Sequence, residues 1–179
     1  RIVVVGDRHQ LVYDFDPEFP ASLDILCKPH ETVHPGPWVR VTTNHTRRLT
    51  RPMCALVNAV FGTSIYSERD GPPVEVRCPR SSFALHSVLS DVSEPYLLLF
   101  DHRRSNAPLR ELVNRVCETR TVHVHGVDGE CDDGIDVCAA TFWSCKGVQA
   151  ETVVVLLPGS APLNPTYVAL TRGTRRLIL

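Results

Sequence analysis

The sequence lacks the long apolar segments typical of membrane proteins and the paired cysteines typical of zinc-binding proteins. Its most apolar stretch, around Thr152 to Pro158, is far shorter than the roughly 18 residues of a membrane span, and no charged-then-apolar signal segment opens the chain. The seven cysteines are odd in number and include no CxxC pair, the spacing typical of zinc sites and redox dithiols. We therefore expect reduced, mostly buried thiols in a soluble intracellular protein of the cytoplasm or nucleus.

A strong charge of either sign is also missing. Nineteen basic and twenty acidic residues give a net charge of −1, so no global field attracts the chain to nucleic acid or anionic lipid, and any such binding is local. With 179 residues, 43% of them hydrophobic, the chain is long and apolar enough for one globular domain or slightly more. We find no internal repeat and no low-complexity tract.

Prolines divide the chain. Five of them lie in residues 16–40 and exclude a long helix there, which predicts a linker. Before it, Ile2–Val5 predicts a buried strand that begins directly after Arg1 without an initiator methionine, which suggests an excised piece. We therefore assign residues 1–15 to the end of one domain and residues 41–179 to a second domain.

The second domain shows strand and helix patterns in alternation. Helices are expected at Thr50–Phe61 (with Pro52 near its start and Gly62 past its end), Phe83–Val88, Asn106–Cys117, near Lys146 and at Thr166–Thr171. Strands are expected at Val74–Arg77, Tyr96–Phe100, Thr121–Val124, Val137–Phe142, Thr152–Leu157 and Leu177–Leu179. This order predicts an α/β fold, a mostly parallel sheet with helices on both faces.

Four segments contain residues suited to phosphate chemistry. Asp7 and Gln10 follow a buried strand, where open α/β sheets bind ligands, and Arg47-Arg48 precedes a helix with guanidinium groups suited to phosphate. The turn Thr141 to Gln149 offers hydroxyl and backbone donors, and Tyr167-Val168-Ala169-Leu170-Thr171-Arg172 places one arginine on an apolar helix.

In order and spacing these segments resemble the later motifs of superfamily 1 helicases, in the UvrD/Rep and viral branches. Gly6 to Phe15 resembles motif III, GDxxQ followed by an aromatic pair, and Tyr96 to Leu112 resembles motif IV. Arg48, ten residues before Asn58, resembles motif IVa, and residues 141–149 and 167–172 resemble motifs V and VI.

The resemblance implies an ATP-dependent helicase or translocase built on two RecA-like domains, of which this chain supplies the second. It implies catalytic roles for Gln10, Arg48 (or Arg47, if the register shifts by one) and Arg172. The nucleotide-binding set is Gly6, Asp7, Gln10, Arg48, Lys146, Gly147, Gln149 and Arg172. The nucleic-acid-binding set is Tyr13, Phe15, Thr141, Trp143 and Ser144. The implied partners are single-stranded or duplex nucleic acid and an N-terminal RecA-like domain of the same chain or polyprotein, and the implied cofactors are ATP and Mg²⁺.

Several features depart from the family pattern. Trp143 and Gln149 stand where the cellular branch has His and Glu, and the short Arg48 to Asn58 motif favours a viral origin, with the host cytoplasm as location. No GxxxxGK[ST] motif and no Asp-Glu strand end occurs, so we expect the Mg²⁺ ligands in an N-terminal half and the isolated chain to be inactive.

The sequence leaves one alternative function open and argues against two candidate metal sites. The alternative function is a non-catalytic RecA-like scaffold that has lost motor activity. The acidic loop Asp128–Asp136 lacks the glycine register of a calcium loop, and His123 and His125 lack a third ligand, so no metal site is predicted.

Overall fold

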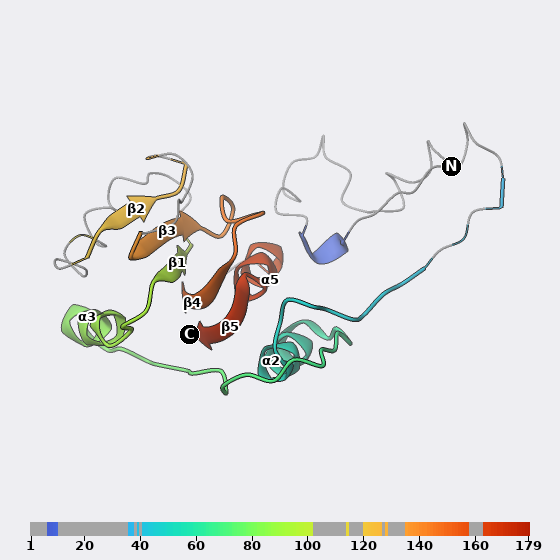
Figure 1. Cartoon of the computed structure of the whole chain (residues 1–179), viewed down its shortest axis with the longest axis horizontal. Coiled ribbons are helices and arrows are strands. Elements are labelled where there is room, and N and C mark those ends of the chain that lie inside the picture. Colours follow the sequence, from blue (N-terminus) through green and yellow to red (C-terminus); the bar gives the residue numbers. More distant parts are fainter. Residues whose placement is uncertain are drawn as a thin grey trace.

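The computed structural model describes residues 7–10, 36–37, 39, 41–101, 114, 120–126, 128, 135–157 and 163–179. Its elements are η1 (Arg8–Gln10), α2 (Arg51–Phe61), α3 (Ser82–Ser90), β1 (Tyr96–Phe100), β2 (Val122–Val124), β3 (Val137–Thr141), β4 (Ala150–Leu156), α5 (Leu163–Leu170) and β5 (Gly173–Ile178). Figure 1 shows their arrangement, with α2 and α3 in the lower part of the view and η1 near α5. Among the described helices, none is long and apolar enough to cross a bilayer.

Helix α2 forms where the sequence predicts it because suitable residues stand at both of its ends. Thr50 is extended before the first turn, and Pro52 occupies the first turn, where a missing N–H breaks no helical bond. Gly62 ends the helix in the left-handed conformation with φ of 64°, and its N–H donates to the carbonyl of Asn58 at 2.9 Å. Met53 and Val57 are fully buried one turn apart, so α2 packs its apolar face on the sheet.

The sheet is parallel throughout its five described strands, in the order β2-β3-β1-β4-β5. The central strand β1 pairs with β3 on one side and β4 on the other, and all five of its residues are buried. A continuous apolar run is therefore stable there because both of its faces are covered.

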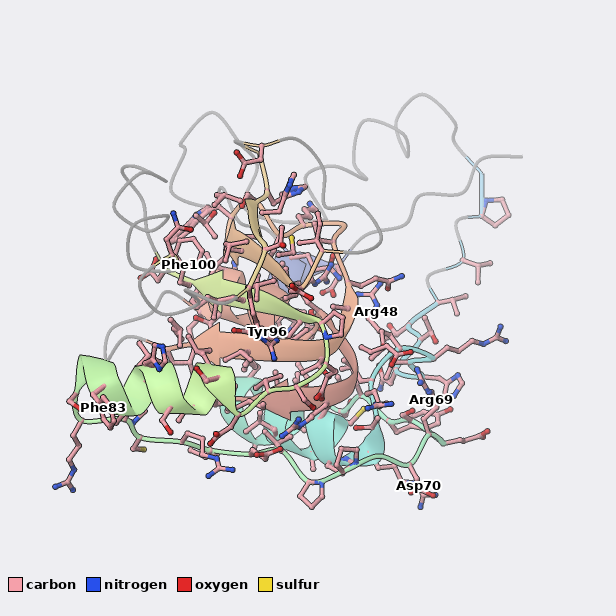
Figure 2. The ribbon with its side chains drawn as sticks, turned by 60° about the vertical axis from the view of Figure 1, so that its left-hand side comes forward. Arg48, Arg69, Asp70, Phe83, Tyr96 and Phe100 are labelled. Carbon is pink, nitrogen blue, oxygen red and sulfur yellow. The ribbon has the colours of Figure 1, made fainter. Side chains whose placement is uncertain are left out.

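Alternate residues of β1 point into two separate cores. Leu97 and Leu99 pack in one cluster with residues of α2 and α5, while Tyr96, Leu98 and Phe100 pack in the other with residues that include Leu89 of α3. In Figure 2, α3 runs along one side of the sheet, below the labelled Tyr96 and Phe100. The α/β fold with a parallel sheet and helices on both faces is thus confirmed.

Three local predictions differ from the structure. The last strand, β5, begins at Gly173 rather than Leu177, because Arg176 is held in the ladder beside Thr152 of β4. Residues 74–77 are extended but form only one bridge, from Glu75 to Ile178, because they lie along the outer edge of β5. The piece near Lys146 is a series of turns at residues 142–147, not a helix.

An ion cluster explains how the charged start of β5 is stabilised. The guanidinium of Arg176 lies 2.7 Å from a carboxylate oxygen of Glu75 and 2.8 Å from one of Glu94. The hydroxyl of Thr152 donates to the same oxygen of Glu94 at 3.0 Å. These contacts join residues 74–77, β5, β4 and the segment before β1.

The expectation of reduced cysteines holds for Cys54, Cys78 and Cys145 but is wrong for Cys138 of β3, which is disulfide-bonded. Pairing depends on which segments meet in space, and the cysteine spacing contains no such signal. The predicted strand Ile2–Val5, most of the linker, nearly all of the Asn106–Cys117 helix and most of the acidic loop lie outside the described residues.

Candidate phosphate-binding cavity

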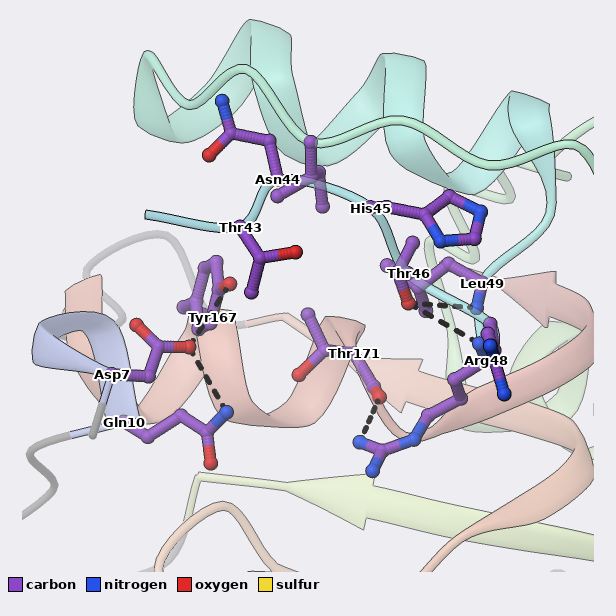
Figure 3. A pocket seen from close by; sticks show the side chains of 12 residues that line it. Asp7, Gln10, Thr43, Asn44, His45, Thr46, Arg48, Leu49, Tyr167 and Thr171 are labelled. Carbon is purple, nitrogen blue, oxygen red and sulfur yellow. Dashed lines mark hydrogen bonds between the residues drawn. The ribbon is translucent and has the colours of Figure 1, made fainter. Parts of the chain in front are cut away.

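A cavity of about 380 Å³ lies between η1, the segment Thr43–Leu49 and α5 (Figure 3). It is lined by Asp7, Gln10, Thr43, Asn44, His45, Thr46, Arg47, Arg48, Leu49, Ile65, Tyr167 and Thr171. Three of the four sequence segments singled out for phosphate chemistry therefore contribute to one cavity, although up to 164 residues separate Asp7 from Thr171.

The carboxylate of Asp7 is held by three donors. It accepts from the backbone N–H of His9 at 3.0 Å, from Nε2 of Gln10 at 3.0 Å and from the hydroxyl of Tyr167 at 3.4 Å. The N–H of Gln10 also donates to the carbonyl of Asp7 at 3.1 Å, which closes the turn of η1. Asp7 and Gln10 thus form one hydrogen-bonded unit with Tyr167 of α5.

Tyr167 connects this unit to the core. Its ring lies 4.9 Å from that of His9 and contacts Phe61 of α2 edge-on at 5.3 Å between centroids. Burial is the main reason that the pKa of Tyr167 is raised to about 12, and the neighbouring charge of Asp7 raises it further. The phenol therefore remains a hydrogen-bond donor to Asp7 at neutral pH.

Arg48 and Arg47 differ in how the structure uses them. The Arg48 side chain is half-buried and donates from Nη1 to the carbonyl of Thr171 at 3.3 Å, whereas Arg47 is exposed. Neither forms an ion pair with a described carboxylate. Both residues line the cavity, and Figure 3 shows the Arg48 guanidinium beside Thr171 at its wall.

Arg172 is close to the cavity but does not line it. It is only 3% exposed and donates from Nε to the carbonyl of Val168 at 2.9 Å and from Nη2 to the hydroxyl of Thr171 at 3.2 Å. Burial lowers the pKa of its guanidinium, and the positive charge of Arg48 lowers it further. Two cations thus face each other across Thr171.

In the turn after β3, the hydroxyls of Thr141 and Ser144 accept hydrogen bonds from backbone N–H groups of the same turn. The N–H of Thr141 donates to Oγ of Ser144, and the N–H of Ser144 donates to Oγ1 of Thr141, both at 3.0 Å. Gly147 has a φ of 95°, which favours glycine, and the exposed Lys146 reaches the carbonyl of Gln10 at 3.5 Å. This turn therefore contacts η1 through Lys146, while its two hydroxyls are engaged internally.

The remaining predicted residues lie elsewhere. Trp143 packs against the core that contains α2 and α5, and Gln149 is exposed before β4. Gly6, predicted to bind nucleotide, and Tyr13 and Phe15, predicted to bind nucleic acid, lie outside the described residues.

Sequence reasoning missed Tyr167 and Thr171 as lining residues. They are four residues apart and so share one helix face, a spacing that identifies them once α5 is recognised as part of a site.

The sequence matches no protein-family profile, and no curated protein is significantly similar to it. Within the described ranges, no group of three or more His, Cys, Asp or Glu side chains is placed to hold a metal ion. The cavity therefore combines two arginines that pair with no described carboxylate, Arg47 and Arg48, with the carboxylate of Asp7.

Proposed function

We propose that the chain is the second RecA-like motor domain of a superfamily 1 helicase or translocase driven by ATP. The observation that supports this most is the cavity, which unites Asp7 and Gln10, Arg48, and the Tyr167 to Thr171 face. These residues belong to three separate segments that resemble motifs III, IVa and VI. The parallel sheet covered by helices on both faces is compatible with this proposal.

The electrostatics favour an anionic ligand. Burial is the main cause that lowers the pKa of Arg172, and repulsion by the charge of Arg48 lowers it further. Arg47 adds a third cation, which pairs with no described carboxylate. An anion beside Arg48 relieves that repulsion, and planar guanidinium groups match the oxygens of a phosphate. The cavity is therefore suited to the terminal phosphates of a nucleoside triphosphate.

In this proposal the two arginines act on the charge that develops as the γ-phosphoryl group leaves. Arg48 contributes from the cavity wall, and Arg172 moves out from Val168 and Thr171 toward the phosphates when the domains close. Asp7 and Gln10 sense the phosphate and, through the contact of Gln10 with Lys146, transmit its presence to the turn after β3. That turn faces nucleic acid, which moves as the cleft opens and closes.

The phosphate loop and the Mg²⁺ ligands belong, in this proposal, to an N-terminal RecA-like domain. When bound there, ATP and Mg²⁺ supply the phosphoryl group and neutralise its charge. The residues of this chain complete the site from the opposite side.

The test is ATP hydrolysis stimulated by nucleic acid, measured on the full protein with its Walker A domain. We expect Arg48→Ala and Arg172→Ala each to lower kcat by about 10³-fold with unchanged nucleic-acid affinity in the absence of nucleotide. Arg47→Ala is the matched control. A larger loss of kcat in Arg47→Ala than in Arg48→Ala means that Arg47, not Arg48, is the motif IVa arginine. A full protein that binds nucleic acid but does not hydrolyse ATP contradicts the motor function and favours a non-catalytic scaffold.

A further inference from the structure

The wall of the cavity that contains Arg48 has no helix or strand of its own. Seven of the twelve lining residues belong to Thr43–Leu49, where the only local support is Oγ1 of Thr46, which accepts from the N–H groups of Arg48 at 3.2 Å and Leu49 at 3.5 Å. An irregular segment holds a side chain precisely only when its backbone is fixed from outside.

Residues 63–69 provide this external support. The backbone of Tyr66 donates to the carbonyl of Asn44 and accepts from the N–H of Thr46, both at 2.9 Å, in a parallel bridge centred on His45. The side chain of Asn44 also donates to the hydroxyl of Ser64 at 2.9 Å. Residues 44–46 are thus held by the backbone of Tyr66 and the side chain of Ser64.

Arg69 holds the next part of the wall. From Nη1 it donates to the carbonyl of Arg47 at 3.0 Å and to that of Arg48 at 2.8 Å. Figure 2 shows Arg69 beside Arg48 on the same side of the molecule. The guanidinium therefore fixes the peptide groups on both sides of the Arg48 Cα.

Asn58 fixes the supporting segment to α2. Its Nδ2 donates to the carbonyl of Ile65 at 2.8 Å, and its Oδ1 accepts from the N–H of Ile65 at 2.9 Å and the hydroxyl of Thr63 at 2.8 Å. One side chain thus replaces the secondary structure that residues 63–65 lack. Ile65 is the cavity-lining residue to which the side chain of Asn58 is hydrogen-bonded in the described part of the chain.

We propose that Asn58 and Arg69 are positioning residues, which hold Arg48 in the cavity through the backbone of residues 63–69 and 44–48. Their effect on hydrolysis rests on the proposed function, whereas their effect on the Arg48 backbone does not. The two are therefore measured separately.

Amide hydrogen exchange in the 179-residue chain tests the positioning directly. In Arg69→Ala we expect the amides of Arg48 and Leu49 to exchange roughly tenfold faster, while those of α2 and the sheet are unchanged. Arg69→Lys recovers part of the protection. Arg51→Ala is the matched control, since its exposed guanidinium bonds only to Asp70 at 3.0 Å, and it leaves these amides unchanged. Equal exchange at Arg48 and Leu49 in Arg69→Ala and wild type overturns the proposal.

Asn58→Asp provides a second variant, because it keeps both acceptor contacts and replaces only the donor to Ile65. We expect faster exchange at Thr46 and Tyr66 first, and at Arg48 as a consequence. Faster exchange confined to residues 63–66, with Arg48 unaffected, shows that Asn58 supports its own loop only and overturns its positioning role.

Kinetics of the full protein test whether Arg69 affects ATP hydrolysis through Arg48. Arg69→Ala lowers kcat with little change in the KM for ATP, and the double variant Arg48→Ala/Arg69→Ala is no slower than Arg48→Ala, because Arg69 acts through Arg48. Additive losses overturn the proposal. If the wild type does not hydrolyse ATP, the proposed function fails, and the exchange measurements alone decide the positioning role.

Discussion

The hydroxyl of Tyr167 lies 3.4 Å from the carboxylate of Asp7, so that α5 is connected to a residue 160 positions earlier in the chain. The same carboxylate accepts from Gln10, which makes Tyr167 the contact through which η1 is fixed beside the cavity. Figure 3 shows these three side chains together on one side of the cavity and Arg48 on the other.

Tyr167→Phe should loosen η1 without unfolding the domain. The ring contacts with Phe61 and His9 remain, while the donor to Asp7 is lost, at a cost of about 1 kcal/mol. Hydrogen exchange at the His9 amide, which donates to the same carboxylate, should accelerate. A large drop in melting temperature with unchanged exchange at His9 contradicts this account.

The ion cluster around Arg176 predicts how stability depends on pH. Hydrogen bonds from Arg176 are the main cause that lowers the pKa of Glu94 to about 2, and the pKa of Glu75 is lowered by the same partner. A carboxylate with a depressed pKa in the folded state stabilises the protein fully above its unfolded value and loses that contribution as the pH falls. Stability should therefore decline from about pH 4.5 toward pH 2.

Denaturant unfolding across this pH range tests the cluster. Glu94→Gln should lower stability at pH 7 and flatten the decline below pH 4.5. Glu151→Gln is the control, because its pair with Arg175 is exposed and 3.6 Å long. A decline that is equally steep in Glu94→Gln and wild type would assign the acid sensitivity to other groups.

Arg172 and Arg48 should differ in their effects on folding. Arg172→Ala removes two hydrogen bonds of a buried, charged side chain, which costs about 1–3 kcal/mol, although the carbonyl of Val168 still accepts from the hydroxyl of Thr171 at 3.0 Å. Arg48→Ala removes one bond from a half-buried side chain and relieves a repulsion, so we expect a change below about 1 kcal/mol. Thermal melting of the two variants distinguishes them, and equal losses contradict the burial difference.

The isolated 179-residue chain should not hydrolyse ATP, with or without nucleic acid. It contains no GxxxxGK[ST] loop to hold the β- and γ-phosphates. Release of inorganic phosphate by the purified chain, abolished by Arg172→Ala, would refute the assignment of that loop to another domain.

Helices and strands were predicted well where neighbouring residues in the sequence define them. Pro52 and Gly62 delimited α2, and the apolar run from Tyr96 to Phe100 matched β1 residue for residue. The start of β5 escaped prediction because the charged Arg176 resembles a loop residue until Glu75 and Glu94 are known to lie beside it. Partners distant in sequence decided that strand.

The candidate site was predictable to a similar extent. Asp7, Gln10 and Arg48 were selected because their residue types suit phosphate and because they follow a predicted strand or precede a helix. Asn58 and Arg69 could not be recognised as supports of the cavity wall, because their partners are backbone groups of an irregular segment. Only the folded arrangement shows these contacts.

The most direct test of the central claim compares a transition-state analogue with a ground-state ligand in the full protein. We predict that ADP with aluminium fluoride binds at least about 100-fold tighter than ADP alone, by calorimetry, because Arg48 acts on transition-state charge. Arg48→Ala should remove most of this difference and leave ADP affinity unchanged, whereas Arg47→Ala should retain it. The same ratio of affinities in Arg48→Ala and wild type would contradict the assignment of this cavity to the transferred phosphoryl group.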